Sequence, residues 1–379
     1  MVAVLVSGKA RSALTAALVC VVCAAQAQDA AEQRRFLMGF TPFPYDMTLE
    51  AVAGVEEFLR ANGDIIAIHF EGVPWAEARS GEAFHPKIIE EWERQLRARP
   101  PGGKVYVAVS PLDLARAGLA TYRAQEEGLP LPEPFAGKAF DDDAVVSAYL
   151  SYCRRAIESL KPDYLAIGVE VNELYHNGFG HWDAYTRLHR QVYEALKQDH
   201  PDLPIFVTFT LHNMRNAGWA DRAEMLSAFR ELMPYNDVVA ISFYPFMAQL
   251  SGDVVDCLEW VVETFGEFGK PYAITECGEP AETLVLEEAG ITIPSGEADQ
   301  SRVVSEVLAF ANAHDFEFLI WYLSRDYDAL WERIRAGAPE FFKAWKDCGL
   351  LAGDGESRPA REVWDEYFST PYRRAGEAP

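Results

Sequence analysis

The chain has 379 residues, and its 58 Asp and Glu outnumber its 34 Lys and Arg, so the formal net charge is -24 at pH 7. Nucleic acid and anionic membrane surfaces would repel a chain of this charge, and we expect neither as a partner. The length is sufficient for one large domain with a substantial core or for two small ones.

The N-terminus has the pattern of a secretory signal peptide. Lys9 and Arg11 form a short positive region, residues 12–22 are apolar, and Ala25-Gln-Ala27 is a small-x-small cleavage signal. The apolar stretch is short for a membrane span. We therefore expect cleavage after residue 27 and a secreted or periplasmic protein that leaves the membrane after cleavage.

The cysteines beyond this leader suggest neither a zinc site nor a fixed disulfide pattern. Export would permit disulfides, but four cysteines allow three pairings, which the sequence leaves open. None of them lies in a Cys-x-x-Cys spacing, so we expect no metal. The four residues are Cys153, Cys257, Cys277 and Cys348.

Eight apolar runs of strand length recur along the chain. They are apolar at nearly every position, which is typical of strands buried on both faces of a parallel sheet. The expected strands are Phe36–Thr41, Ile65–Phe70, Val105–Ser110, Tyr164–Val171, Ile205–Thr210, Val238–Phe243, Tyr272–Thr275 and Phe318–Leu323.

Amphipathic segments fill the gaps between these runs. One of them opens with three acidic residues at 141–143, where a helix dipole favours negative charge, and continues with apolar residues at helical spacing. The expected helices are Leu49–Ala61, Val145–Leu160, Ile88–Ala98, Ala184–Gln198, Ala223–Met233, Val254–Phe268, Asp299–Ala313 and Phe341–Asp347.

This alternation predicts an α/β fold, a (β/α)8 TIM barrel, as a single domain over residues 28–370 with a disordered tail at 371–379. A doubly wound open sheet is the alternative, but the first strand lacks the Gly-x-Gly-x-x-Gly of a dinucleotide-binding domain. The longest connections, Pro111–Lys138 and Cys277–Glu297, would both lie on the active face of the barrel.

The carboxyl ends of the expected strands carry polar and aromatic residues, as the pocket of such a barrel requires. Two glutamates follow strands four and seven, where their side chains can enter a cleft. The candidates in chain order are His69, Glu71, Glu170, Asn172, Glu173, His212, Asn213, Tyr244, Glu276 and Trp321.

Three short segments resemble motifs of clan A of the glycoside hydrolases, the retaining barrel glycosidases. They are Asn172-Glu173, Ile274–Gly278 and Ser242–Phe246, and the last is similar to the strand-six segment of the endo-β-1,4-galactanase family in that clan. They follow the order of the clan's motifs and fall on the corresponding strands. The resemblance covers the architecture of the whole mature chain, but only these segments in sequence.

The resemblance implies roles for individual residues. Glu173 would be the acid/base and Glu276 the nucleophile of a double displacement, which requires two carboxyl groups about 5–5.5 Å apart. Asn172 would bind the sugar 2-hydroxyl, Tyr244 would orient Glu276, and Trp321 would stack on a sugar ring.

Glu170 is a rival to Glu173. Strict alternation along the strand places Glu170 and Asn172 on one face and Glu173 on the other. We keep Glu173 as the first candidate and expect Glu170 to line the pocket. His69 with Glu71, and His212 with Asn213, are expected to line it too, although either histidine could equally be an interior side chain.

The expected function is a monomeric retaining glycoside hydrolase that cleaves a β-linked sugar or polysaccharide without a cofactor. A glycan-binding barrel that has lost turnover is the alternative. A barrel esterase or lyase is less well supported, because no Gly-x-Ser-x-Gly segment occurs in the chain. The sugar, its linkage and the position of cleavage do not follow from the sequence.

Overall fold

The computed structural model describes residues 33–215 and 222–373. The predicted signal peptide lies outside these ranges. Within them, the main sheet contains β1 (Leu37–Phe40), β2 (Ile65–Phe70), β3 (Lys104–Val109), β4 (Tyr164–Ala166), β5 (Ile205–Phe206), β6 (Thr208–Thr210), β7 (Val239–Phe243), β8 (Tyr272–Cys277) and β11 (Phe316–Trp321).

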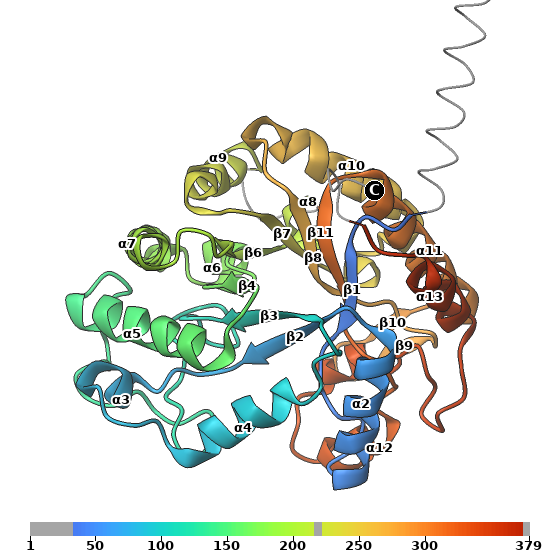
Figure 1. Cartoon of the computed structure of the whole chain (residues 1–379), viewed down its shortest axis with the longest axis horizontal. Helices are drawn as coiled ribbons and strands as arrows, with labels where there is room; N and C mark the ends of the chain where they lie inside the picture. The colour runs from blue at the N-terminus through green and yellow to red at the C-terminus, as the bar shows by residue number, and fades with distance from the viewer. Residues whose placement is uncertain (1–32, 216–221, 374–379) are drawn as a thin grey trace, which may run out of the picture.

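The strands of this sheet are parallel and close into a barrel. Their order is β5-β4-β3-β2-β1-β11-β8-β7-β6, and its two end strands, β5 and β6, are separated in the chain only by Val207. The N–H of Thr208 in β6 donates to the carbonyl of Gly168, just after β4, at 3.0 Å. The predicted (β/α)8 barrel, in which β5 and β6 together count as one strand, is therefore confirmed (Figure 1).

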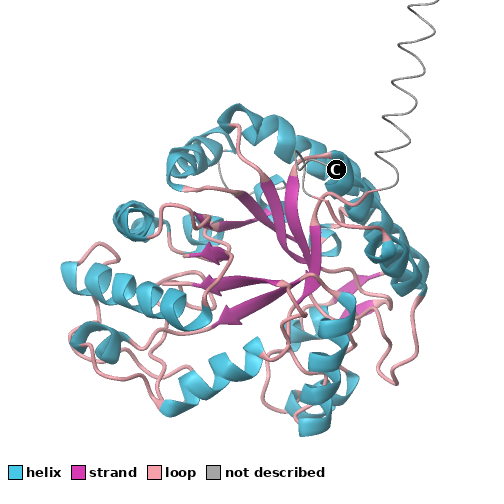
Figure 2. Ribbon diagram, viewed as in Figure 1, coloured by secondary structure: helices cyan, strands magenta, loops and turns pink. Residues whose placement is uncertain are grey.

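Helices surround the barrel (Figure 2). They shield the outer faces of the strands, while side chains such as Tyr106, Phe206 and Phe318 fill the barrel interior. The helices are α2 (Leu49–Asn62), α3 (Trp75–Ser80), α4 (Pro86–Leu96), α5 (Asp143–Leu160), α6 (Asn172–Asn177), α7 (Trp182–Asp199), α8 (Leu211–Arg215), α9 (Arg222–Leu232), α10 (Val254–Phe265), α11 (Glu297–Ala313), α12 (Asp328–Ile334) and α13 (Pro359–Ser369).

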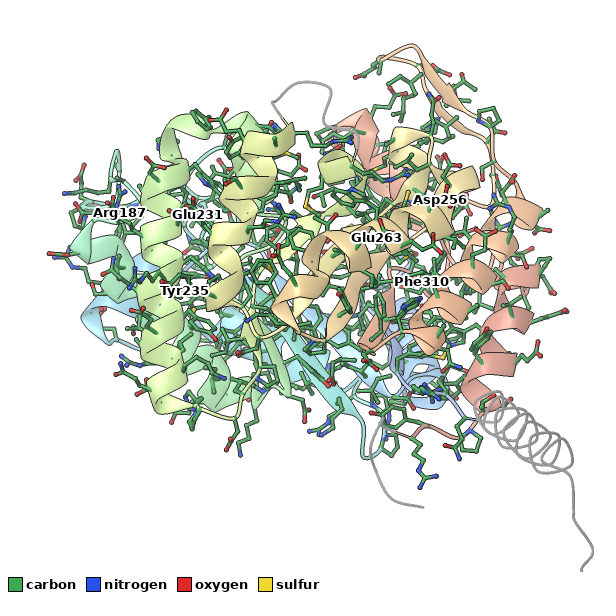
Figure 3. The ribbon with its side chains drawn as sticks, turned by 90° about the horizontal axis from the view of Figure 1, so that it is seen from above. Arg187, Glu231, Tyr235, Asp256, Glu263 and Phe310 are labelled. Atoms are coloured by element: carbon green, nitrogen blue, oxygen red, sulfur yellow. The ribbon has the colours of Figure 1, made fainter. Side chains whose placement is uncertain are left out.

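The outer helix faces carry much of the acidic charge. Glu231 of α9 and Glu263 of α10 are exposed, as is Arg187 of α7 (Figure 3). In the described part of the chain, no helix is both long and apolar enough to cross a membrane. All four cysteines of this part are buried free thiols.

The structure corrects two expected elements. β4 ends at Ala166 rather than Val171, and Glu170 adopts a φ of 52°, which is outside the β region. The helix expected at Phe341–Asp347 is a 3-10 segment, Glu340–Trp345, and the final outer helix is α13, which begins with a proline suited to a first turn.

Residues 371–373 of the expected tail 371–379 are described, and the rest of that tail lies outside the described residues. Arg34 N–H donates to the carbonyl of Pro371 at 3.1 Å, and Arg373 N–H donates to the carbonyl of Arg34 at 2.8 Å. These contacts join residues 371 and 373 to the N-terminal segment of the described chain.

The two long insertions lie at the carboxyl ends of the strands, as expected. The segment after β3 is tied down by bridges that pair Leu112 with Leu119 and Tyr122 with Leu129. The segment after β8 contains an antiparallel hairpin of β9 (Leu284–Leu286) and β10 (Ile291–Ile293). The first insertion supplies a residue to the site described next.

Candidate active site

Glu276 is a buried carboxylic acid near the end of β8, with 8% of its surface exposed. The hydroxyl of Tyr244 donates to its Oε2 at 2.8 Å, and Nδ1 of His69 lies 3.3 Å from its Oε1. Burial raises the pKa of Glu276 to about 8, and the charge of Glu170 adds to this rise, whereas Tyr244 and Arg116 oppose it. The contact between Tyr244 and Glu276 that the resemblance implied is present.

His69 is neutral in this environment. Burial lowers its pKa to about 4, and the nearby charge of Arg116 acts in the same direction. A neutral imidazole can donate from Nδ1 to the ionised Glu276, which leaves Nε2 as an acceptor. That Nε2 is buried and has no hydrogen-bond partner among the described residues. His69 can therefore hold Glu276 and still accept a hydrogen bond from a ligand hydroxyl.

Arg116 is the functional candidate that the sequence did not reveal. It comes from the insertion after β3, is 7% exposed, and has its Nη2 3.5 Å from Oε2 of Glu170. Burial opposes its charge, but Glu71, Glu170 and Glu276 outweigh burial and raise its pKa. The length of the insertion was the only sequence signal, because one arginine in a loop forms no pattern.

Glu173 lies at the start of α6 and is bound to a different set of groups. Nδ2 of Asn213 donates to its Oε1 at 2.8 Å, and Nδ2 of Asn172 lies 3.4 Å from the same atom. Burial raises its pKa, Asn213 opposes the rise, and the charge of Glu170 adds to it. The structure thus brings Asn213 into contact with Glu173, two residues that were each expected at the pocket.

Glu170 is the carboxylate with the strongest effect on Glu276. Its charge is the largest electrostatic cause of the raised pKa of Glu276, ahead of Arg116 and Glu71. The left-handed backbone at Glu170 interrupts the alternation after β4, so its side chain follows no simple strand pattern. The exposed residue Glu71 lies close enough to Arg116 to act on its pKa.

Asn172 is fully buried, and its side-chain amide is hydrogen-bonded to the backbone of Thr210. Its Nδ2 donates to the carbonyl of Thr210 at 3.1 Å, and its Oδ1 accepts from the Thr210 N–H at 2.7 Å. These bonds tie the start of α6 to β6. They occupy both ends of the amide, so the structure does not support the expected contact of Asn172 with a sugar 2-hydroxyl.

Trp321 is not available as a sugar platform, contrary to expectation. It is 1% exposed, and its indole N–H donates to the carbonyl of Cys348 at 2.8 Å. The next residue, Tyr322, faces the site instead. Its ring lies 5.8 Å from the ring of Tyr244 and 5.7 Å from the ring of Phe43.

His212 follows β6 in α8 and is 5% exposed. Burial lowers its pKa to about 4, so it is neutral. Its Nδ1 is buried without a hydrogen-bond partner among the described residues. Among the described residues, no hydrogen bond or ion pair joins His212 to the carboxylates of the site. The predicted role of His212 in substrate binding therefore stays a prediction.

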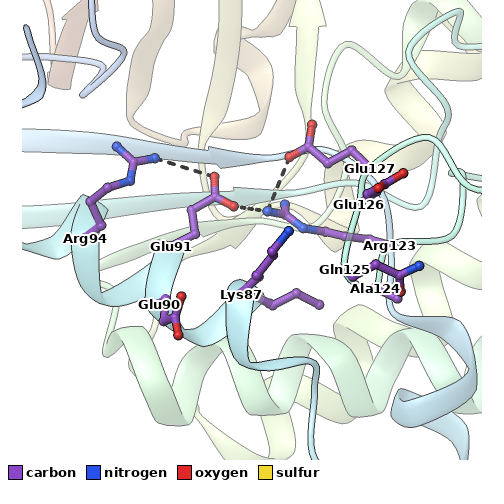
Figure 4. A pocket seen from close by; sticks show the side chains of 10 residues that line it. Lys87, Glu90, Glu91, Arg94, Arg123, Ala124, Gln125, Glu126 and Glu127 are labelled. Atoms are coloured by element: carbon purple, nitrogen blue, oxygen red, sulfur yellow. Dashed lines mark hydrogen bonds and ion pairs between the residues drawn. The ribbon is translucent and has the colours of Figure 1, made fainter. Parts of the chain in front are cut away.

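A groove of about 460 Å³ lies outside this cluster, between α4 and residues 123–127. Figure 4 shows Arg123 between Glu91 and Glu127, with which it forms ion pairs. Arg94 also pairs with Glu91, at 3.8 Å. None of the carboxylates lining this groove is as buried as Glu276. We therefore interpret the groove as a partly solvated ion-pair network.

Comparisons with known proteins show a likeness of fold. No protein-family model matches the chain, and no curated protein matches it. The structure resembles native xylanase 10B from Thermotoga maritima, with a TM-score of 0.58 and 12% identity over 90% of this chain and 97% of that chain. It also resembles a fungal β-1,4-galactanase, with a TM-score of 0.55 and 16% identity over 87% and 99% of the two chains.

A further similar structure is a GH5_18 protein from Bifidobacterium longum subsp. infantis. Its TM-score is 0.62, at 14% identity over 90% of this chain and 80% of that chain. At such low identities the likeness establishes the fold alone. The chain is thus a TIM barrel of the form found in these enzymes, with a buried carboxylate site at the carboxyl ends of its strands.

Proposed function

We propose that the protein is a retaining glycosidase that acts on a β-linked sugar, with Glu276 as nucleophile and Glu170 as acid/base. The observation that carries the proposal is the buried Glu276, held by Tyr244 and His69 with Glu170 as the strongest charge acting on it. The similar barrels named as a xylanase and a galactanase support the same reaction class.

The hydrogen-bond donors around Glu276 suit a nucleophile. The Tyr244 hydroxyl donates to one oxygen of its carboxylate, which favours the charged form, and Nδ1 of His69 lies 3.3 Å from the other oxygen. The ionised Glu276 attacks the anomeric carbon, and the bond to the leaving oxygen breaks. A glycosyl-enzyme results, which water then hydrolyses with the same configuration at the anomeric carbon as in the substrate.

Glu170 is the proposed acid because its charge acts on Glu276 more strongly than that of any other carboxylate. The mechanism requires an ionised Glu276 and a protonated acid beside it. When Glu170 gives its proton to the leaving oxygen it becomes negative, and Arg116 at 3.5 Å stabilises that charge. Glu170 then accepts a proton from the attacking water.

Glu173 was the first candidate for this role from the sequence. Its carboxyl oxygen is instead occupied by Asn213 and Asn172. We assign to it a positioning role beside the pocket.

Substitution of the three glutamates by glutamine separates these roles. We expect Glu276→Gln to abolish hydrolysis of 4-nitrophenyl β-glycosides and β-1,4-linked oligosaccharides. We expect Glu170→Gln to slow cleavage of oligosaccharides by about 10²–10⁴-fold, because their leaving groups need an acid. Cleavage of 2,4-dinitrophenyl glycosides should fall far less, and azide should yield the β-glycosyl azide.

The matched variant is Glu173→Gln. If it shows the leaving-group dependence and azide product while Glu170→Gln does not, the acid/base is Glu173. Sugar binding without turnover in the wild-type protein would favour the glycan-binding alternative. We also propose export through the leader at residues 1–27, which N-terminal sequencing of the secreted protein tests.

A further inference from the structure

An aromatic cavity lies beside the carboxylate site. Its volume is about 130 Å³, and it is formed by α12 and the 3-10 segment Glu340–Trp345, both of which follow β11. Among the residues that line it are Tyr322, Tyr327, Trp331, Ile334, Phe342 and Trp345.

The cavity shares a wall with the proposed active site. Tyr322 lines the cavity, and its ring packs edge-on against Tyr244 at 5.8 Å, whose hydroxyl binds Glu276. The ring of Trp345 lies 5.9 Å from Tyr244 and 6.3 Å from Tyr322. The rings of Tyr322 and Tyr244 are therefore what separates the cavity from Glu276.

The size of the cavity suits one six-membered ring. An apolar cavity of about 150 Å³ in another protein is known to hold benzene, so about 130 Å³ accommodates one ring and not two. A longer ligand would have to extend from the cavity toward Glu276.

The chemistry of the lining suits a sugar ring better than a purely apolar group. Trp331, Phe342 and Trp345 offer aromatic surface, on which the C–H face of a pyranose can pack. The indole N–H of Trp345 is buried and has no partner among the described residues, so it can donate to a hydroxyl. The one lining cation, Lys346, is paired with Asp328 and Asp347, so no free charge calls for an ionic ligand.

We propose that this cavity is a subsite for a second, uncharged sugar ring of the substrate. This inference rests on the proposed function. The leaving group departs beside the acid, Glu170, which follows β4, whereas the residues that line the cavity follow β11, four strands away in the order of the sheet. The second ring therefore belongs to the part of the substrate that remains attached to Glu276, and the preferred substrate has at least two sugars on that side of the cleaved bond.

The test compares 4-nitrophenyl β-glycosides of disaccharides (cellobiose, mannobiose, xylobiose and galactobiose) with those of the matching monosaccharides. The variant Ile334→Trp fills the cavity, and Val255→Trp adds the same side chain on the exposed face of α10 as a control. For the best wild-type pair, we expect Ile334→Trp to lower the disaccharide-to-monosaccharide ratio of kcat/KM by about tenfold or more, mainly through KM. Val255→Trp should leave the ratio unchanged.

A second measurement separates this inference from the proposed function. Binding of the unlabelled disaccharides is measured by calorimetry in the Glu276→Gln background, with and without Ile334→Trp. Weaker binding in the filled variant supports the subsite even if the wild-type protein hydrolyses none of the glycosides, in which case only the proposed function fails.

An unchanged ratio of kcat/KM together with unchanged binding overturns the subsite, whether or not the protein is a glycosidase. Trp345→Phe keeps a ring and removes the indole N–H, so it should weaken disaccharide binding less than Trp345→Ala. Equal losses in these two variants would also contradict stacking. Thermal unfolding of each variant confirms that the fold is intact.

Discussion

Arg116 lies among the carboxyl groups of the site, and its charge influences how readily Glu276 and Glu173 ionise. It opposes the rise in pKa of Glu276 and of Glu173, and it contacts Glu170 at 3.5 Å. Because it is buried, its charge is poorly screened by water or salt. Its side chain also anchors the insertion, since Nη1 donates to the carbonyl of Asp113 at 3.0 Å.

Replacement of Arg116 by methionine should shift the pH dependence of the reaction. Without the cation, the pKa of Glu276 rises, so a higher pH is needed to ionise the nucleophile. The acidic limb of kcat/KM should move up by about one pH unit, and activity should fall more at pH 6 than at pH 8. Arg116→Lys, which keeps the charge, should shift the limb less. An unmoved limb in Arg116→Met would show that this charge does not control the nucleophile.

At the scale of elements, an ion-pair cluster around the buried Arg358 and Asp326 joins the segments that follow the barrel strands to α13. Arg358, just before α13, is 5% exposed and contacts Asp326 at 2.5 Å, Glu297 at 3.0 Å and Glu282 at 3.1 Å. Asp326 is 1% exposed and also accepts from the N–H of Gly349 at 2.7 Å. The cluster thereby holds the chain that forms the aromatic cavity.

Removal of one partner should leave a buried charge without compensation. We expect Arg358→Met to lower the free energy of unfolding by about 3–5 kcal/mol, measured by urea denaturation. Adding Asp326→Leu to this variant should recover much of the loss, because the uncompensated carboxylate is then gone. A loss below about 1 kcal/mol for Arg358→Met would mean that solvent reaches the cluster.

At the scale of the whole molecule, buried carboxyl groups couple stability to pH. Burial raises the pKa of Glu276 from 4.5 to about 8 and that of Glu279 from 4.5 to about 7. Between the ordinary and the raised values, the folded protein binds more protons than the unfolded chain does. The free energy of unfolding therefore falls as pH rises through this window. The net charge of -24 adds repulsion in the same direction.

Calorimetric unfolding should show this dependence directly. We expect Tm to fall by about 2–6 °C between pH 5.5 and pH 8.5, because protonated carboxyl groups become charged while buried. Glu279→Gln, which lies outside the proposed reaction, should reduce the fall, since the amide cannot ionise. A Tm that rises over this range would contradict the raised pKa values.

The fold was predictable because its signals are local and periodic. The expected run Ile65–Phe70 is β2 without change, and the runs around β7 and β8 differ from the strands by one or two residues at their ends. The errors lie where a local signal was missing. The end of β4 depends on the backbone at Glu170, and the 3-10 segment Glu340–Trp345 has the apolar spacing of a helix without its hydrogen bonds.

The sequence by itself determined the barrel, and the resemblance of Ser242–Phe246 to a glycosidase segment implied the contact between Tyr244 and Glu276 that the structure contains. Only the tertiary structure decided that Arg116 enters the site, that Glu170 acts on Glu276 more strongly than Glu173 does, and that Tyr322 rather than Trp321 faces it. A loop arginine, a left-handed residue and the facing of one ring depend on contacts between segments far apart in the chain, and those contacts exist only after the barrel has closed.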